Sequence, residues 1–277
     1  MISVLILTLN EQANLPRCLE SVKWSDDIVI LESGSSDQTL EIARQYGARI
    51  YHRPFDNERD HRTYSLREID YKYPWVYNPD ADEVTTEALR DEMHAVVQDP
   101  RREEVAYRCR FKNMFMGQWL KYSSLYPTWV MRLFQPDKIS FRRSINLHYQ
   151  AEGKEGRLQS HFLHYSFNKG FAAWFYKHNM YSSFEAEETR LEMIRGRMDW
   201  SGLFCVSDGV RRRRALKSLS LRMPLRPMAR FIYMYIVRAG FLDGKAGLTY
   251  CILLSIYEYM IVLKVREARL REKNLSL

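Results

Sequence analysis

Three carboxylates stand within four residues directly after an apolar run. Residues 75–77 are typical of a buried strand, and Asp80, Asp82 and Glu83 follow them. In open α/β sheets, ligands bind at the carboxyl ends of the strands. Negative charge crowded at that position favours a cation, and carboxylate oxygens are ligands that Mg²⁺ or Mn²⁺ prefers. The alternative is a solvated turn, because the Asp-x-Asp pattern alone is common.

The residues before these carboxylates alternate between strand and helix patterns. Residues 2–9 are almost continuously apolar and β-branched, as in a strand covered on both faces. Strands that alternate with helices predict an α/β fold with a mostly parallel sheet. Further strands are predicted at residues 27–31, at residues 49–52 and from residue 75, with helices after Pro16, from residue 40 to a stop at Gly47, and around residues 64–69.

Length and composition indicate a cytosolic protein with one large domain and an appendage. The chain has 277 residues, and 46% of them are hydrophobic, which is ample for a buried core. Its first residues already belong to a predicted core strand, so we expect no signal peptide. The four cysteines (Cys18, Cys109, Cys205 and Cys251) are widely separated. We therefore expect them to be reduced and to act as small apolar side chains.

Positive charge is concentrated at the C-terminal end of the chain. From Trp200 onward there are 15 Lys and Arg residues against 5 Asp and Glu residues, whereas the preceding 199 residues carry 27 against 29. These two balances, +10 and −2, give the formal net charge of +8. Such a segment could meet nucleic acid or anionic lipid. No recognised nucleic-acid motif accompanies it, so we expect no nucleic acid partner.

Apolar stretches beside the basic residues favour a membrane surface as the partner. Four arginines occupy residues 211–214, and residues 246–263 carry Glu258 as their single charge. A spanning helix needs about 20 apolar residues, so this stretch is marginal. We expect peripheral attachment to the inner face of an anionic membrane. The alternative is an ordinary buried helix of the globular domain.

Seven short motifs, in order along nearly the whole chain, resemble the family 2 glycosyltransferases. The similarity is closest to the bacterial branch that builds lipopolysaccharide core and other surface glycans. It implies a GT-A fold, a Rossmann-like sheet flanked by helices. We expect a catalytic domain over residues 1–199, with its nucleotide-sugar half at 1–100 and its acceptor half at 101–199, and a helical membrane-associating segment over residues 200–277. The motifs are residues 4–11, 31–39, 78–83, 117–120, 131–134, 163–166 and 240–244.

The resemblance implies a nucleotide-binding role for residues that follow the first two strands. Thr8, Asn10 and Glu11 are expected to contact the base and ribose, although Asn10 and Glu11 could merely begin a helix. Glu32 stands where the family usually has Asp, and it can still accept from a nucleobase N–H or a ribose hydroxyl. Asp37 either caps the next helix or joins the nucleotide pocket.

The resemblance also implies separate roles for the carboxylates that follow residue 77. Asp80 is expected to contact ribose, and Asp82 is expected to ligate Mg²⁺ or Mn²⁺ against the donor diphosphate. His148 is expected to complete the metal or diphosphate site. Arg62 could contact the diphosphate or lie on a solvated helix face, and Trp119 could contact the acceptor sugar or belong to the core.

The general base is harder to assign. Close relatives place a Glu after the residue equivalent to His148, but this chain has Tyr149, and a phenol with a pKa near 10 is a poor base at neutral pH. Glu152 is the predicted substitute, with Glu155 or Glu83 next, although a solvated loop carboxylate would look the same. His164 is expected to be a structural histidine.

These observations predict a metal-dependent inverting glycosyltransferase. A nucleotide-sugar donor, most simply a UDP-sugar, would give its sugar to a hydroxyl of a lipid-linked or lipopolysaccharide-core saccharide. A nucleotidyltransferase shares carboxylates at strand ends and a metal, but the motifs at Trp119, His148 and residues 240–244 do not support it. A non-catalytic, membrane-bound sugar-nucleotide scaffold is the other alternative, motivated by Glu32 and Tyr149.

Overall fold

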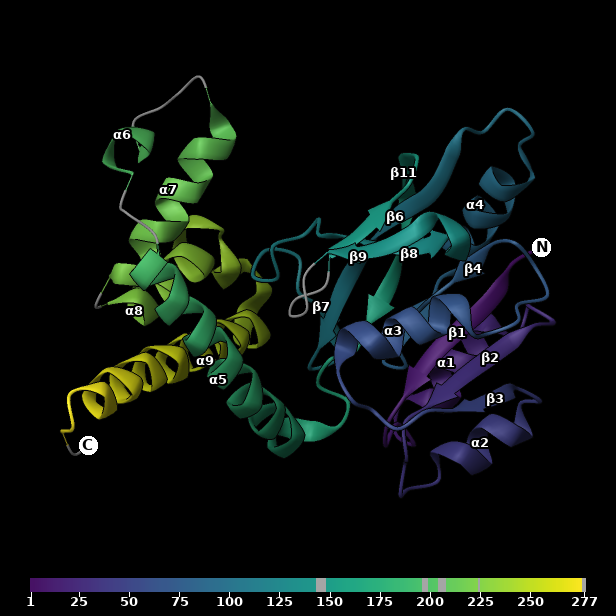
Figure 1. Ribbon diagram of the computed structural model, residues 1–277, viewed down its shortest axis with the longest axis horizontal. Coiled ribbons are helices and arrows are strands. Elements are labelled where there is room, and N and C mark those ends of the chain that lie inside the picture. The colour runs from purple at the N-terminus through teal and green to yellow at the C-terminus, as the bar shows by residue number, and fades with distance from the viewer. Residues whose placement is uncertain (143–147, 196–198, 204–207, 224, 276–277) are drawn as a thin grey trace. The chain divides into compact units, whose positions relative to one another are not determined.

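The computed structural model describes residues 1–142, 148–195, 199–203, 208–223 and 225–275, and it divides into two compact units (Figure 1). Unit 1 comprises Met1–Trp119 and Tyr126–Lys169, and unit 2 comprises Leu120–Leu125 and Gly170–Leu277. The division falls at Lys169/Gly170 and not at the predicted boundary of 199/200. The physical reason is that helix α5 (Gly170–Arg195) packs against the C-terminal helix α9 (Gly244–Glu272).

Unit 1 is built on a mixed sheet that is nine-stranded among the described residues. Its order is β3-β2-β1-β4-β8-β6-β11-β5, with β7 paired to β6, and β9 and β10 form a separate two-stranded sheet. The strands are β1 (Ser3–Thr8), β2 (Ile28–Glu32), β3 (Arg49–His52), β4 (Val76–Tyr77), β5 (Glu83–Thr85), β6 (Glu104–Phe115), β7 (Gln118–Trp119), β8 (Trp129–Phe134), β9 (Ile139–Arg142), β10 (His148–Ala151) and β11 (Lys154–His164).

Four strands at one end of this sheet are parallel, as the sequence predicts. β1 pairs in parallel with β2 and with β4, and β2 pairs in parallel with β3. Chain order therefore reverses at β1, and the crevice at the carboxyl ends of β1 and β4 is a topological switch point, where such sheets bind ligands. The predicted α/β class is confirmed, and antiparallel β8 extends the sheet beyond β4.

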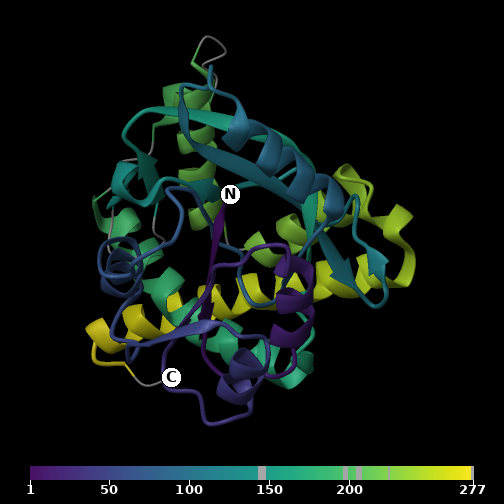
Figure 2. The ribbon, with the colours of Figure 1, turned by 90° about the vertical axis from the view of Figure 1, so that its right-hand side faces the viewer.

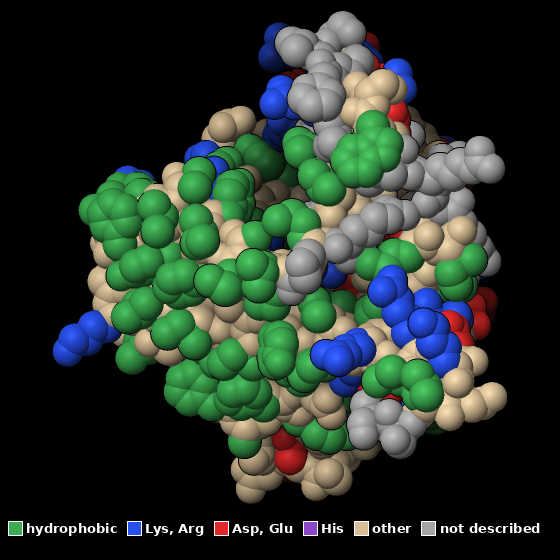
Figure 3. All heavy atoms as spheres, turned by 90° about the vertical axis from the view of Figure 1, so that its left-hand side faces the viewer, with side chains coloured by type: hydrophobic (Ala, Val, Ile, Leu, Met, Phe, Trp, Pro, Cys, Tyr) green, Lys and Arg blue, Asp and Glu red, His purple; other side chains and the backbone are tan. Residues whose placement is uncertain are grey.

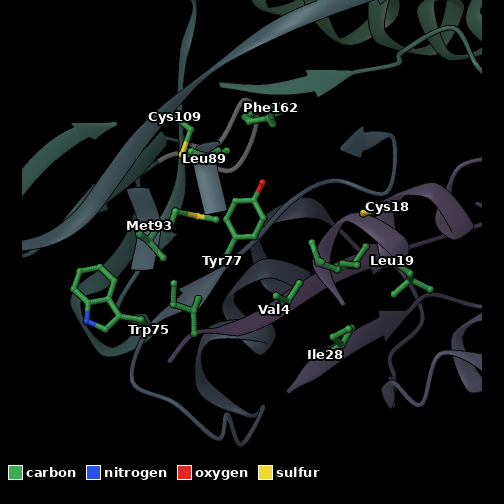
Figure 4. Close-up of a cluster of buried hydrophobic side chains, with 14 of the residues drawn as sticks. Val4, Cys18, Leu19, Ile28, Trp75, Tyr77, Leu89, Met93, Cys109 and Phe162 are labelled. Atoms are coloured by element: carbon green, nitrogen blue, oxygen red, sulfur yellow. The ribbon is translucent and has the colours of Figure 1, made fainter. Parts of the chain in front are cut away.

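Helices cover this sheet because their apolar residues recur at helical spacing. In α1 the buried residues are Leu15, Cys18, Leu19 and Val22, which form one face. They meet β1, β2 and β4 in a continuous core in which Tyr77 points toward Leu89 and Met93 of α4 (Figure 4). The helices of unit 1 are α1 (Leu15–Val22), α2 (Thr39–Gln45), α3 (Glu58–Arg67), α4 (Glu87–Gln98) and the 3₁₀ helix η1 (Pro136–Lys138).

Apart from Leu120–Leu125 and short connections, the described residues of unit 2 form helices. Its long helix α9 is continuous over 29 residues (Figure 2). Cys251 of α9 is buried and reduced, like Cys18 and Cys109 of unit 1, whereas Cys205 lies outside the described residues. The helices are α5, α6 (Trp200–Leu203), α7 (Gly209–Arg222), α8 (Arg226–Ile232), the π-helix η2 (Tyr233–Val237), the 3₁₀ helix η3 (Gly240–Asp243) and α9.

The motif at residues 240–244 has a structural role within unit 2. The carboxylate of Asp243 is buried and accepts hydrogen bonds from the backbone N–H groups of Lys121, Tyr122 and Ser123 at 2.8–3.1 Å. It also accepts from the hydroxyl of Ser123 at 2.7 Å. Gly240 approaches the same segment so closely that a Cβ there would stand 3.2 Å from that of Ser123 and 2.6 Å from a backbone oxygen. The motif therefore fixes residues 121–123.

Replacing Asp243 with Ala should lower the free energy of unfolding of unit 2 by about 3 kcal/mol, because it leaves several buried donors without their charged acceptor. Chemical denaturation followed by helical circular dichroism would measure the loss. Asp243→Asn is the matched control, since its amide oxygen can still accept from part of the set and should cost less. An Ala variant as stable as the wild type would contradict this role.

Candidate active site

The turn that carries the three carboxylates is organised by a buried arginine. Arg132 of β8 is 8% exposed, and its Nη2 contacts Asp80 and lies 2.5 Å from Oε1 of Glu83. The turn closes on itself as well, because Glu83 donates its N–H to the carbonyl of Asp80 and accepts the N–H of Asp80 through its side chain. Arg132 therefore fixes the direction of the whole turn.

The pKa values of Glu83 and Asp80 are shifted in opposite directions. Burial raises the pKa of Glu83 to about 7, although Arg132 opposes the shift. Burial also works against ionisation of Asp80, but the positive charges of Arg132 and Arg62 outweigh it and hold the pKa of that carboxyl below its ordinary value. The Asp80 side chain remains 41% exposed. Asp80 is thus an ionised, accessible acceptor, and Glu83 is a supporting group behind it.

Asp82 lies beside a histidine of a neighbouring strand, because β5, which begins at Glu83, pairs with β11. Nε2 of His164, the last residue of β11, is 3.4 Å from Oδ2 of Asp82. On the other side of the ring, Nδ1 donates to Oδ1 of Asn113 at 2.9 Å. Burial alone would lower the pKa of His164, but the hydrogen bond and charge of Asp82 raise it above its ordinary value. Both ring nitrogens of His164 thus have partners, as expected for a structural histidine, and one of these partners is a predicted site carboxylate.

Asp82 and His164 fit a divalent cation as a pair of ligands. A metal-bound histidine commonly donates its other ring N–H to an oxygen, as His164 does to Asn113. The described residues contain no group of three or more His, Cys, Asp or Glu side chains that could hold a metal ion. Two protein ligands suit Mg²⁺ or Mn²⁺ when phosphate and water oxygens fill the other positions. The side chain of His148, the predicted second ligand, lies outside the described residues.

Arg62 and Tyr149 form a second pair at the same end of the sheet. Nη1 of Arg62 donates to the hydroxyl of Tyr149 at 2.6 Å, and its Nη2 lies 4.0 Å from Asp80. Both side chains also approach Oδ1 of Asn78, at 3.4 and 3.5 Å. Arg62 therefore lies inside the site and not on a solvated helix face. Tyr149 stands at the position where close relatives have a Glu, and here its hydroxyl accepts a hydrogen bond from Arg62.

Two of the predicted nucleotide-binding residues end neighbouring strands. Thr8, at the end of β1, is 2% exposed, and its hydroxyl has no hydrogen-bond partner among the described residues. A buried, unsatisfied hydroxyl is costly, and a ligand could supply the missing bond. Glu32, at the end of β2, accepts from the N–H groups of Gly34 and Ser35 and contacts Nδ1 of His52 at 3.3 Å. Its carboxylate shapes the loop that follows.

The loops after β1 and β2 are tied to each other through the remaining predicted residues. Asn10 accepts the N–H of Ser36 through Oδ1 at 2.8 Å. Asp37 accepts the N–H of Gln12 at 3.1 Å and that of Thr39 at 3.0 Å, so it caps a turn and joins the two loops at once. The carboxylate of Glu11 contacts Asn14 and Lys169. These contacts give the edge of the predicted nucleotide pocket a fixed shape.

Trp119 lies in the β6–β7 hairpin, close to the Asp82–His164 pair in register. It pairs with Met114, the residue after Asn113, and Asn113 pairs with His164. The half-buried indole packs edge-on against Tyr126 at 5.1 Å, and Nζ of Lys112 lies 4.4 Å from the ring centre. Trp119 therefore lies near the Asp82–His164 pair along the sheet, and its contact with an acceptor stays a prediction.

Among the described residues, no side-chain contact links Glu152, the predicted general base, to the carboxylate turn. Glu152 precedes β11, and its N–H bonds the carbonyl of Lys138, whereas His164 ends the same strand beside Asp82. Eleven residues of strand span roughly 30 Å. Glu155 is at the same far end and pairs with Arg108 at 2.7 Å. Proximity of Glu152 to Tyr149 in sequence does not bring it to the carboxylates.

Sequence reasoning gave no role to Arg132 and only a structural role to His164, although both contact the carboxylates after β4. Arg132 and His164 both lie in motifs on which the family resemblance rests, at residues 131–134 and 163–166. These motifs could have drawn attention to both residues. Their positions in the sequence, however, do not show that they contact Asp80 and Asp82. Pairing across the sheet supplies that link.

The mostly parallel sheet, the switch point and the carboxylate turn agree with the family comparison. The model of glycosyl transferase family 2 matches residues 3–173, so the chain belongs to this family and is a glycosyltransferase.

Relatives and solved structures extend this comparison. An uncharacterised glycosyltransferase of Rickettsia typhi is 24% identical, over 99% of this chain and 89% of its own length. LpsC of Rhizobium meliloti, a lipopolysaccharide core biosynthesis glycosyltransferase, is 34% identical over 32% of this chain and 34% of its own. Among solved structures, Staphylococcus aureus TarS has a TM-score of 0.42 at 12% identity, covering 93% of this chain and 90% of that one. Glucosyl-3-phosphoglycerate synthase of Mycobacterium tuberculosis, solved with Mn²⁺ and UDP-glucose, has a TM-score of 0.34 at 21% identity, covering 40% of this chain and 44% of that one.

Proposed function

We propose that this glycosyltransferase is metal-dependent and inverting. Its donor would be a nucleotide sugar, most simply a UDP-sugar, and its acceptor a hydroxyl of a lipid-linked or lipopolysaccharide-core saccharide. The observation that carries the proposal is the Asp82–His164 pair at 3.4 Å, adjacent to the ionised Asp80 at the sheet's switch point. The name of LpsC supports the acceptor class.

Each side chain of the site then has a distinct task. Asp82 and His164 would hold Mg²⁺ or Mn²⁺, which when bound supplies Lewis-acid stabilisation of the leaving diphosphate. Asp80 would accept from a ribose hydroxyl, and Arg132 keeps its carboxylate ionised and aimed. Arg62, held by Tyr149, would place a second positive charge near the diphosphate. Thr8 would satisfy its buried hydroxyl on the nucleoside.

Inversion by a single in-line displacement requires a base that removes the acceptor proton as the hydroxyl attacks. Among the described residues, neither Glu152 nor Glu155 contacts the carboxylate turn, and Glu155 pairs with Arg108. Glu83 is buried and bound to Arg132, so little of its side chain is accessible to an acceptor. We infer that the base is another group on the acceptor side of the site, beyond the carboxylate turn.

We also propose that the protein works at the cytoplasmic face of the cell membrane, bound peripherally through unit 2. The segment Gly240–Glu272 is the one helix among the described residues that is long and apolar enough to cross a membrane by length and composition. A lipid-linked acceptor would be presented at such a surface. Neither nucleic acid nor a further protein is needed.

A transfer assay tests this function. The full chain would be incubated with radiolabelled UDP-sugars, Mn²⁺ and membranes that contain truncated lipopolysaccharide core. Donors would first be ranked by thermal shift, because a ligand that binds the native state stabilises it. We expect label in the lipid fraction and none after EDTA. Donor binding without turnover would favour the non-catalytic scaffold, and release of pyrophosphate from a nucleoside triphosphate would favour a nucleotidyltransferase.

A further inference from the structure

Unit 2 exposes many large hydrophobic side chains that lie on consecutive helices. We define the apolar surface as thirteen large hydrophobic side chains that are each 37–69% exposed on and beside α8, η2, η3 and α9. They are Leu225, Met228, Ile232, Tyr233, Ile236, Val237, Phe241, Leu242, Leu248, Ile252, Ile256, Tyr259 and Leu263. Figure 3 shows hydrophobic side chains gathered over a broad area of the face that carries these helices. Contiguous apolar patches of this extent mark interaction sites.

The α9 part of this surface is a single stripe. Its members Leu248, Ile252, Ile256, Tyr259 and Leu263 follow one another at intervals of four, four, three and four residues, which keeps them on one face. The other faces hold the buried residues of α9, which are Ala246, Gly247, Cys251, Leu253, Ile261 and Val265. The helix therefore has one side packed on unit 2 and one apolar side turned outward.

The acidic residues near the apolar surface are engaged within unit 2, and the other charged residues there are basic. Residues 225–263 contain two acidic residues, and both are engaged within unit 2. Asp243 accepts the backbone N–H groups of residues 121–123, and Glu258 forms an ion pair with Arg226 at 2.6 Å, each side chain being about 15% exposed. The other charged residues of this range are Arg230, Arg238 and Lys245. The charge presented beside the apolar side chains is thus positive.

We propose that the apolar surface inserts into one leaflet of an anionic phospholipid bilayer, with Arg230, Arg238 and Lys245 at the headgroups. Apolar side chains bordered by cations are complementary to acyl chains bordered by phosphates. A second copy of this chain is a poorer occupant, because it would bring the same cations against each other. This inference deepens the proposed membrane attachment, and it does not depend on glycosyl transfer.

Insertion into one leaflet also explains why α9 need not span the bilayer. A spanning α9 would be separated from α5 and α8, against which it packs. Six buried side chains would lose their contacts, and Glu258 would lose Arg226 and enter the hydrocarbon as an unpaired charge, which is costly. An α9 that lies along the interface keeps all of these contacts. The structure also places Arg211 of the arginine run in an ion pair with Asp199 at 2.7 Å, so its charge is partly engaged within unit 2.

Vesicle binding by the full chain tests the inference. Co-sedimentation would use vesicles of phosphatidylcholine alone and of phosphatidylcholine mixed with phosphatidylglycerol. Ile236 and Val237 are well exposed, so the double variant Ile236→Asn/Val237→Asn should fold normally. We expect it to bind mixed vesicles at least tenfold more weakly than the wild type, because amide side chains do not gain from burial among acyl chains as Ile and Val do. Salt should weaken wild-type binding without abolishing it.

Met116→Asn is the matched control, since it removes an equally exposed apolar side chain from unit 1. Met116 and Gly117 both have positive φ in the β6–β7 turn, a geometry that Asn-Gly favours. Its vesicle binding should equal that of the wild type. Lys245→Gln gives a second, gentler test: binding to mixed vesicles should fall about fivefold, with binding to neutral vesicles unchanged.

Two results would overturn the inference. One is wild-type vesicle binding by a double variant whose circular dichroism is native. The other is a wild-type protein that ignores vesicles but dimerises in solution, with the double variant monomeric, which would assign the surface to a second copy. Thermal shift with the UDP-sugar reads the donor site separately, so loss of vesicle binding with intact donor binding concerns this surface alone.

Discussion

Replacing Asp82 with Asn should lower the rate of sugar transfer about a thousandfold while the free energy of unfolding stays near that of the wild type. The change removes the charge that would hold the cation, and the loss of one preorganised electrostatic group at a reacting centre costs about 10² to 10³ in rate. The side chain is partly exposed and the backbone contacts of the turn remain, so the fold should persist. Initial rates with UDP-sugar and Mn²⁺ would measure the effect.

Two further variants make this prediction specific. Glu152→Gln should leave turnover near that of the wild type, because Glu152 precedes β11 at the end opposite His164. His164→Ala should raise the Mn²⁺ concentration needed for half-maximal rate, since it removes the other member of the pair. Normal turnover of Asp82→Asn would show that the cation, if one is used, binds elsewhere.

The second large effect is expected at Arg132. Changing it to Gln should lower the free energy of unfolding of unit 1 by about 3–5 kcal/mol and abolish transfer. The guanidinium is buried between two carboxylates, and removing one partner of a buried ion pair leaves an uncompensated charge inside the protein. Asp80 would also lose the contact that keeps it ionised and aimed. Urea denaturation and the transfer assay would measure the two losses.

The double variant Arg132→Gln/Glu83→Gln separates charge from packing. It removes the buried carboxylate together with its partner, so part of the stability should return. Transfer should stay low, because Asp80 still lacks its arginine. If Arg132→Gln alone were as stable as the wild type, the ion pairs of Arg132 with Asp80 and Glu83 would not stabilise unit 1. Recovery of transfer in the double variant would show that Arg132 acts on the reaction only by neutralising Glu83.

Local sequence determined the parallel half of the fold and the position of the carboxylates. The apolar run at residues 2–9 became β1, residues 49–52 became β3 without change, and Gly47 ends the α2 region with a positive φ. Such features are readable because burial on both faces, helical spacing and glycine's conformational freedom act over a few neighbouring residues. The same local logic placed Thr8, Asp80 and Asp82 at strand ends, and parallel strands bring their carboxyl ends together.

Tertiary structure decided which distant residues join that turn. Arg132 reaches Asp80 from 52 positions away, and His164 meets Asp82 because the antiparallel pairing of β11 with β5 places His164 opposite Glu83. Among the described residues, Glu152 is close to Tyr149 in sequence but precedes β11 and makes no side-chain contact with the turn. Tyr149, in contrast, contacts Arg62 across 87 positions. Sequence spacing carries no information about such pairs, because strand length and cross-strand register set these distances. The boundary at Gly170 was likewise fixed by the packing of α5 on α9, a contact between segments that no local pattern links.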